Sequence, residues 1–141
     1  MRLLALGLLL AALAGCAGGS PAEVEQFGGE EFARPCAGVE SPLNSDAVVP
    51  AGFPVYDGWQ GTLRATQGKT VIVFGRAPAD DVAVVQARQR SQLEAAGLRI
   101  VSTDREGQAE AEISFAGVRE GSVQITPLCR GTVQIRYKFI R

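Results

Sequence analysis

Apolar and polar side chains alternate along the C-terminal part of the chain. In the clearest run, Val133, Ile135, Tyr137 and Phe139 alternate with polar residues. A period of two is typical of antiparallel strands that bury one face and leave the other in solvent. Glu-Gly and Arg-Gly pairs separate this run from similar ones and indicate turns. The pattern predicts four strands, over residues 98–104, 109–115, 122–127 and 132–140.

Two further strands are expected earlier in the chain, over residues 61–65 and 70–75. The sequence Gln67-Gly68-Lys69 between them favours a turn. The second strand, TVIVFG, is a continuous apolar run rather than an alternating one. Such a run is expected in a central strand whose two faces are both covered.

One helix is predicted between these two groups of strands. Pro78 suits its start, and Asp80 and Asp81 in the first turn complement the positive end of the helix dipole. Helix capping explains the two aspartates, which could otherwise suggest a metal or catalytic pair. Gly97 suits the position just after the last turn. Residues at helical spacing form the apolar stripe, with Gln89 as its polar member: Val82, Val85, Gln89, Leu93 and Ala96.

The elements follow one another in the order ββαββββ, which predicts an α+β fold. We expect a two-layer sandwich, in which a mostly antiparallel sheet of about five to six strands packs its apolar face against one helix. The passage from Thr70 to Asp104 is long enough for a crossover and would allow one parallel pair. If residues 37–60 lie over the sheet, they would cover the second face of the TVIVFG strand.

The N-terminus has a different pattern, in which one charge precedes an uninterrupted apolar run. Arg2 is followed by eleven uncharged residues, Leu3–Leu13. This arrangement is typical of a secretory signal peptide, and the run is shorter than the roughly 20 apolar residues that span a bilayer. We therefore expect residues 1–15 to be a signal peptide of an exported chain. A buried core helix is the alternative.

Leu13-Ala14-Gly15-Cys16 ends the apolar run and resembles the lipobox of bacterial lipoproteins. The resemblance covers only the first 16 residues. It implies cleavage before Cys16, a diacylglyceryl thioether on its sulfur, and often a further acyl chain, such as palmitate, on the new amine. Two or more acyl chains hold a protein stably at a membrane. An ordinary secretory signal with an incidental cysteine is the alternative.

Lipidation would place the protein in the cell envelope. With two membranes, we expect it on the periplasmic side of the outer membrane; with one, on the outer face of the plasma membrane. Residues 16–35 are expected to form a flexible linker, and residues 36–141 a single domain. Residues 17–45 carry five glutamates and one arginine, whereas the rest of the chain after them has a net charge of +2. Such an acidic tether would be repelled by anionic lipid. The alternative to a flexible linker is that Phe27 and Phe32 dock on the domain.

Two cysteines, Cys36 and Cys129, remain once Cys16 carries lipid. Export brings them into an oxidising compartment, where an even number of cysteines predicts a disulfide bond. They lie 93 positions apart, and closing so long a loop would stabilise the domain by about 4–5 kcal/mol. Two free thiols or a redox pair are the alternatives, although the Cys-X-X-Cys spacing of redox pairs is missing.

Histidine is absent from the sequence. Its absence excludes a Ser–His–Asp triad and any metal site that needs imidazole. We find no phosphate loop, nucleophile elbow, metal-ligand spacing or nucleic-acid motif. We therefore expect no enzyme activity, no cofactor, no metal and no nucleic-acid partner. Catalysis by carboxylates such as Asp57, Asp104 or Glu106 is the remaining alternative.

Contacts with a partner or ligand are expected at two places. Tyr56 and Trp59 could form an aromatic platform, or could simply cover the end of the core. The solvent face of the sheet could bind a partner, and we single out Arg136 and Lys138 there. The polar residues expected on that face are Glu112, Gln124, Gln134, Arg136 and Lys138.

These observations favour a lipid-anchored envelope protein with a non-catalytic accessory domain that docks on another envelope component. In layout, the domain resembles the small helix-on-sheet modules of accessory lipoproteins in outer-membrane assembly. One alternative is a small-ligand-binding lipoprotein with an apolar pocket between the helix and residues 55–59. Another is an inhibitor of a secreted hydrolase.

Overall fold

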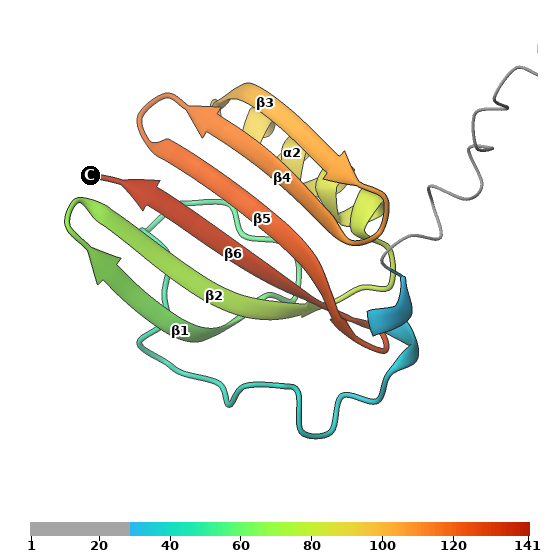
Figure 1. The fold of residues 1–141 in the computed structure, drawn as a ribbon. Helices are drawn as coiled ribbons and strands as arrows, with labels where there is room; N and C mark the ends of the chain where they lie inside the picture. The colour runs from blue at the N-terminus through green and yellow to red at the C-terminus, as the bar shows by residue number, and fades with distance from the viewer. Residues whose placement is uncertain (1–28) are drawn as a thin grey trace, which may run out of the picture.

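A computed structural model describes residues 29–141, which form six strands, one α-helix and a short 3-10 helix (Figure 1). The α+β sandwich with the order ββαββββ is therefore confirmed. The expected signal peptide, the lipidated Cys16, Phe27 and most of the expected linker lie outside the described residues. The elements are η1 (Glu30–Ala33), β1 (Gln60–Gln67), β2 (Thr70–Pro78), α2 (Val82–Ala95), β3 (Arg99–Glu106), β4 (Glu110–Ala116), β5 (Glu120–Cys129) and β6 (Thr132–Ile140).

The six strands form one sheet in the order β1-β2-β6-β5-β4-β3, and every neighbouring pair is antiparallel. The last strand, β6, therefore lies inside the sheet between β2 and β5. Strands β2 and β3 point in the same direction, but three other strands separate them. The parallel pair that the passage over residues 70–104 would allow is for this reason not formed.

One face of the sheet forms the core. Along β4, β5 and β6 the buried side chains alternate with half-buried ones, as the sequence pattern predicted. Strand β2 alternates too, because Val71 and Val73 are buried, whereas Ile72 and Phe74 are half-buried on the other face. The expectation that β2 is covered on both faces was therefore wrong. The residues buried at the centre include Ile113, Phe115, Val123, Ile125, Val133, Ile135 and Tyr137.

Helix α2 begins at Val82 and packs across β3, β4 and β5. Its N-cap is Asp81, whose carboxylate accepts hydrogen bonds from the backbone N–H groups of Ala83, at 2.8 Å, and Val84, at 3.1 Å. Asp81 therefore precedes the first turn, and Pro78 ends β2 rather than starting the helix. At the other end, the helix finishes at Ala95, and Gly97 after the C-cap adopts a φ of +81°, which glycine tolerates without strain.

The other half of the core layer comes from residues 36–59, which we call the connecting segment. Figure 1 shows this segment passing below β1 and then running behind the sheet, on the same side as α2. Two glycines allow it to lie against the strands. A Cβ atom at Gly61 would lie 1.9 Å from the carbonyl oxygen of Ala47, and one at Gly75 would lie 2.3 Å from the Trp59 ring. The second half of residues 37–60 thus lies over the sheet, but on the core face.

The pKa of Asp81 lies below its ordinary value of 3.8. Partial burial by itself would raise this pKa, but the hydrogen bonds from Val84, Gln108 and Ala83 and the positive charge of Arg105 outweigh burial. Because the folded-state pKa is depressed, the ionised carboxylate stabilises the fold above the ordinary pKa. That stabilisation is lost as the pH falls through the folded-state pKa.

Replacing Asp81 with alanine should lower the free energy of unfolding by about 1 kcal/mol at neutral pH, because the N-cap hydrogen bonds are lost. Asp80→Ala removes an equal charge one residue earlier and should change stability by less than about 0.5 kcal/mol. Urea unfolding of both variants at neutral and strongly acidic pH measures this. The deficit of Asp81→Ala should shrink in acid; equal deficits for the two variants at neutral pH would contradict the capping role.

Candidate functional site

Within residues 29–141, no helix covers the face of the sheet opposite α2. Figure 1 views the sheet from this side, with α2 behind it. We call it the open face, and it consists of the side chains that alternate with the core residues. The five polar residues expected there from the sequence are all half-buried and alternate with buried neighbours. The open face includes Ile72, Phe74, Asp104, Glu112, Ser114, Ser122, Gln124, Gln134, Arg136 and Lys138.

The open face carries basic and apolar side chains together where β1, β2 and β6 meet. Arg136 on β6 pairs with Phe74 on β2, and Lys138 pairs with Ile72. Leu63 on β1 pairs in turn with Phe74, and 52% of Leu63 is exposed. Side chains of directly paired residues lie about 5 Å apart at Cβ. Arg136 and Lys138 therefore border a patch of three large apolar side chains that water reaches.

Carboxylates gather at the opposite side of the open face, on the hairpin of β3 and β4. Asp104 pairs directly with Glu112, and Glu106 pairs directly with Glu110. Directly opposed like charges destabilise a sheet by roughly 0.2–1 kcal/mol per pair. Asp104, Glu106 and Glu112 were candidates from the sequence, but their opposition to other carboxylates was not predicted. The signal was present, because both pairs are equidistant in sequence from Gln108, in the turn of the hairpin.

None of the three ion pairs within residues 29–141 involves the four carboxylates of that hairpin, Arg136 or Lys138. One pair, Arg90 with Glu94, lies within α2, and another joins Arg88 of α2 to Asp57 of the connecting segment. The third joins Arg76 to Glu40 at 2.8 Å. Arg76 also lies on the open face, beside Gln134, and is the one charge there that has an ion-pair partner among the described residues. The open face thus runs from the apolar patch on β1 and β2, through basic β6 and neutral β5, to the acidic hairpin of β3 and β4.

Tyr56, a candidate contact residue, lies in the core layer, where only 6% of it is exposed. Its backbone N–H donates to the Tyr137 hydroxyl at 2.8 Å. That hydroxyl donates to Oε1 of Gln89 at 2.8 Å, and Nε2 of Gln89 donates to the Pro54 carbonyl at 3.0 Å. We call this chain of bonds the buried relay. The relay explains why the polar Gln89 lies in the apolar stripe of α2. Burial in the core raises the pKa of the Tyr137 phenol.

Trp59, the second aromatic candidate, packs edge-on against Tyr137 with their ring centroids 5.3 Å apart. Its Nε1–H donates to the Ile135 carbonyl at 3.3 Å. The ring thus lies on the core face, over Gly75. The region between α2 and residues 55–59, where the sequence suggested an apolar pocket, holds the buried relay. Tyr56 and Trp59 therefore do not lie with Arg136 and Lys138, which project from the other face.

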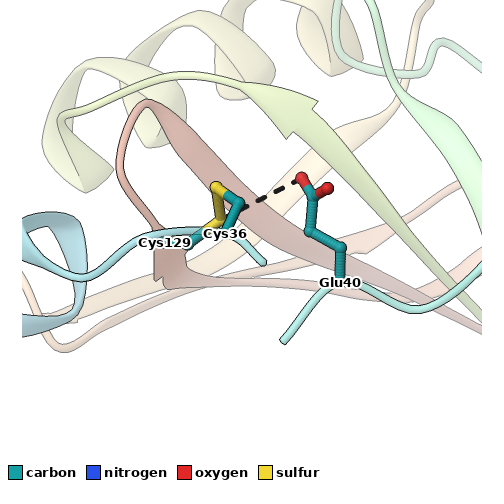
Figure 2. Close-up of side chains that lie close together, drawn as sticks. All are labelled: Cys36, Glu40 and Cys129. Carbon is teal, nitrogen blue, oxygen red and sulfur yellow. Dashed lines mark hydrogen bonds between the residues drawn. A yellow bond between two sulfur atoms is a disulfide. The ribbon is translucent and has the colours of Figure 1, made fainter. Parts of the chain in front are cut away.

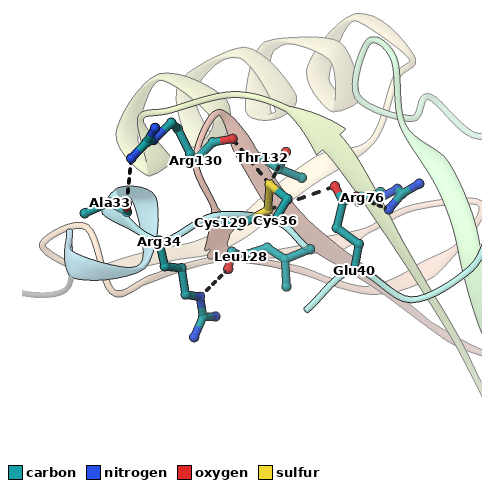
Figure 3. The surroundings of a disulfide bond; sticks show 9 residues. All are labelled: Ala33, Arg34, Cys36, Glu40, Arg76, Leu128, Cys129, Arg130 and Thr132. Atoms are coloured by element: carbon teal, nitrogen blue, oxygen red, sulfur yellow. Dashed lines mark hydrogen bonds and ion pairs between the residues drawn. A yellow bond between two sulfur atoms is a disulfide. The ribbon is translucent and has the colours of Figure 1, made fainter. Parts of the chain in front are cut away.

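A disulfide bond joins Cys36 to Cys129, as the sequence predicted, with their Cα atoms 5.0 Å apart. Figure 3 shows that it fastens the start of the connecting segment to the end of β5. Hydrogen bonds strengthen this junction. Nε of Arg34 donates to the Leu128 carbonyl at 2.8 Å, and the Arg130 backbone N–H donates to the Arg34 carbonyl at 2.9 Å. The last residues of the expected linker are thus held against the β5–β6 turn.

Glu40 lies beside this disulfide (Figure 2), with a carboxylate oxygen 4.0 Å from the Cys129 sulfur. The two sulfurs and this oxygen lie within 4.8 Å of one another, a spacing that would suit metal ligands if the cysteines were thiolates. In the structure the sulfurs are bonded to each other and carry no negative charge. The other Glu40 oxygen is paired with Arg76. The cluster is therefore a structural junction.

The three carboxylates considered for catalysis do not converge. Asp57 belongs to the connecting segment, where it pairs with Arg88 and accepts a hydrogen bond from Gln92 at 3.2 Å. Asp104 and Glu106 lie on β3, on the open face. The sheet separates these two residues from Asp57, so the three cannot act together on one substrate.

No family model, curated protein or solved structure matches the chain significantly. Neither helix formed by residues 29–141 has the length and hydropathy of a membrane span. The open face, with unpaired charges on β3, β4 and β6 and exposed apolar side chains, is the candidate functional site.

Replacing Tyr137 with phenylalanine should lower the free energy of unfolding by about 2 kcal/mol or more, because the Tyr56 N–H and Gln89 Oε1 lose their partner inside the core. Tyr56→Phe removes the same hydroxyl from a neighbouring ring but leaves the relay intact, so it should change stability by less than about 0.5 kcal/mol. Thermal and urea unfolding of both variants measure this difference. A nearly neutral Tyr137→Phe would show that the relay does not hold the layers together.

Proposed function

We propose that this protein is a lipid-anchored component of the cell envelope whose α+β domain is non-catalytic and binds another envelope protein through the open face. The anchor follows from the resemblance of residues 13–16 to a lipobox. The single observation that carries the docking role is that two directly opposed carboxylate pairs share the open face with Arg136 and Lys138, the basic row, two strands away on β6, without an ion pair to them.

The acidic hairpin supports docking because its arrangement is unfavourable in the isolated chain. Two neighbouring like-charge pairs destabilise the sheet by about 1 kcal/mol together. A lysine-rich or arginine-rich surface placed over Asp104, Glu106, Glu110 and Glu112 would turn this repulsion into attraction. A docked partner thus supplies the neutralising charges that the three ion pairs of residues 29–141 do not supply.

The other half of the open face defines the rest of the partner. Arg136 and Lys138 would attract acidic side chains of a partner. The neighbouring apolar side chains would be buried on association: Leu63, Ile72 and Phe74. The partner is therefore a protein surface with a basic region facing β3 and β4 and an acidic, partly apolar region facing β6 and β2. Charge order of this kind selects one orientation and excludes the reverse one.

The proposed anchor leaves room for such docking. Gly29, the first described residue, is 13 residues after Cys16, which corresponds to at most about 45 Å of extended chain. The acidic character of this stretch would keep the domain off an anionic membrane surface. The open face could then meet a partner beyond the lipid headgroups. We propose this location on the periplasmic side of an outer membrane, or on the outer face of a single plasma membrane.

Photo-crosslinking in intact cells tests the docking role. A photoreactive amino acid at Gln124, in the middle of the open face, should capture one envelope protein, identified by mass spectrometry. The same amino acid at Val84, which is 59% exposed on α2, serves as the control and should not capture it. The cross-linked peptide of the partner should contain the acidic and basic side chains described above.

Charge reversal separates the loss of docking from the loss of folding. Glu110→Lys with Glu112→Lys converts both like-charge pairs into attractive ones, so thermal stability should rise while capture falls at least about tenfold. Asp80→Lys with Glu94→Lys makes the same change of net charge away from the open face and should leave capture intact. Unchanged capture by the first double variant, or capture of only a second copy of this chain, would overturn the proposal.

A further inference from the structure

A second candidate site lies at the end of the sheet where β6 finishes and the β1–β2 and β4–β5 hairpins turn. It is a hollow of about 510 Å³, within the usual range of small-molecule sites, about 300–1,000 Å³. Its walls come from parts of the chain far apart in sequence, including Val48 of the connecting segment, Val71 of β2 and Val118 of the β4–β5 turn. Neither Tyr56 nor Trp59 lines it.

The hollow gathers apolar side chains that water reaches. Three of the eight large apolar residues that are exposed within residues 29–141 line it: Val118 at 96%, Val48 at 57% and Ile140 at 45%. Buried Phe139 and Val71 form its deeper wall. Scattered exposed apolar residues are ordinary, but a group that surrounds one hollow indicates a surface that binds apolar matter.

Three arginines, Arg64, Arg119 and Arg141, line the same hollow, and no acidic residue does. None of the three forms an ion pair or a side-chain hydrogen bond within the described part of the chain, where the paired arginines are Arg76, Arg88 and Arg90. A guanidinium group presents a planar fork of donors that matches a carboxylate or a phosphate. The rim of the hollow thus provides free positive charge beside apolar walls.

We propose that this hollow binds a single-chain anionic amphiphile, with the hydrocarbon chain against Val71, Val118 and Phe139 and the anionic headgroup on Arg64 and Arg119. A bounded hollow with apolar walls and a few convergent polar groups suits such a molecule better than a flat protein contact. The site is independent of the proposed docking through the open face, because Val71 and Phe139 belong to the core face of the sheet. Figure 1 shows that the C-terminal end of β6, which supplies Phe139 and Ile140 to the hollow, is the end of the strand remote from η1.

The position of the hollow keeps it away from the expected anchor. The chain enters the described domain at η1, beside the β5–β6 turn, and the nine residues of β6 run from that turn to the hollow. At about 3.4 Å per residue, the two ends of the domain are roughly 30 Å apart. A ligand in the hollow is thus held at the end of the domain remote from the tether.

Photolabelling of the full chain in phosphatidylcholine nanodiscs tests this site. The probes are diazirine-bearing dodecanoate and dodecyl phosphate, which share the chain and differ in the anion. Matched probes with an alcohol or a quaternary ammonium headgroup are the controls. Both anionic probes should label peptides containing residues 48–50, 117–119 or 139–141, and the neutral and cationic probes should label them at least about tenfold less. Labelling by only one anionic probe would identify the headgroup as a carboxylate or a phosphate and would still support the site.

Two sets of variants decide the outcome. Arg64→Gln with Arg119→Gln should reduce labelling by the anionic probes at least about tenfold, whereas Arg90→Gln with Arg105→Gln, an equal change of charge elsewhere, should not. Val118→Asp, at a position that is 96% exposed, should keep the fold and abolish labelling. Equal labelling by all headgroups, unchanged labelling of the arginine variant, or binding only to vesicles rich in phosphatidylglycerol would overturn the proposal.

Discussion

The buried relay from Tyr56 through Tyr137 to Gln89 is the constraint on which the rest of the structure depends. A helix of 14 residues cannot cover a sheet of six strands, so the core needs a second covering element. The connecting segment supplies it, although it has no regular secondary structure to satisfy its backbone. Polar groups buried without a partner are costly. The relay gives hydrogen-bond partners to the Tyr56 N–H and the Pro54 carbonyl, where the helix, the connecting segment and the sheet come together.

Because the helix and the second half of the connecting segment both cover one face of the sheet, that face is apolar and buried whereas the other is polar and partly exposed. The helix and the connecting segment share the core face, and the disulfide at Cys36 fixes where the segment starts. The carboxylates of the β3–β4 hairpin and the side chains of Arg136 and Lys138 are displayed on the other face. There the acidic hairpin and the basic row lie two strands apart, on β4 and β6, too far to neutralise each other across β5. The docking proposal is a consequence of this separation.

Sequence alone predicted most of the fold, because alternation in β4, β5 and β6 and the capping residues of α2 are local signals. The disulfide was predicted by counting the cysteines of a chain that is expected to be exported. The sequence did not reveal that β2 pairs with β6, since long-range strand order leaves no local pattern. It also misjudged the continuous apolar run of β2, because Ile72 and Phe74 are half-exposed apolar residues that look like core residues in a sequence.

The candidate sites were harder to predict because they depend on register and on loops. Arg136 and Lys138 could be assigned to the solvent face by their spacing, but the opposed acids required the pairing of β3 with β4. Tyr56 and Trp59 were considered as ligand contacts, whereas in the structure both side chains pack in the core layer. The hollow rimmed by Arg64 and Arg119 joins three chain segments whose proximity only the folded sheet creates.

The most direct test of a lipid-held binding domain is the intact mass of the protein extracted from membranes of its native cells. The protein should begin at Cys16 and carry the added mass of a diacylglyceryl group, with or without a further acyl chain on the amine. A mature terminus at any other residue, or an unmodified Cys16 sulfur, would contradict the anchored arrangement proposed for this domain.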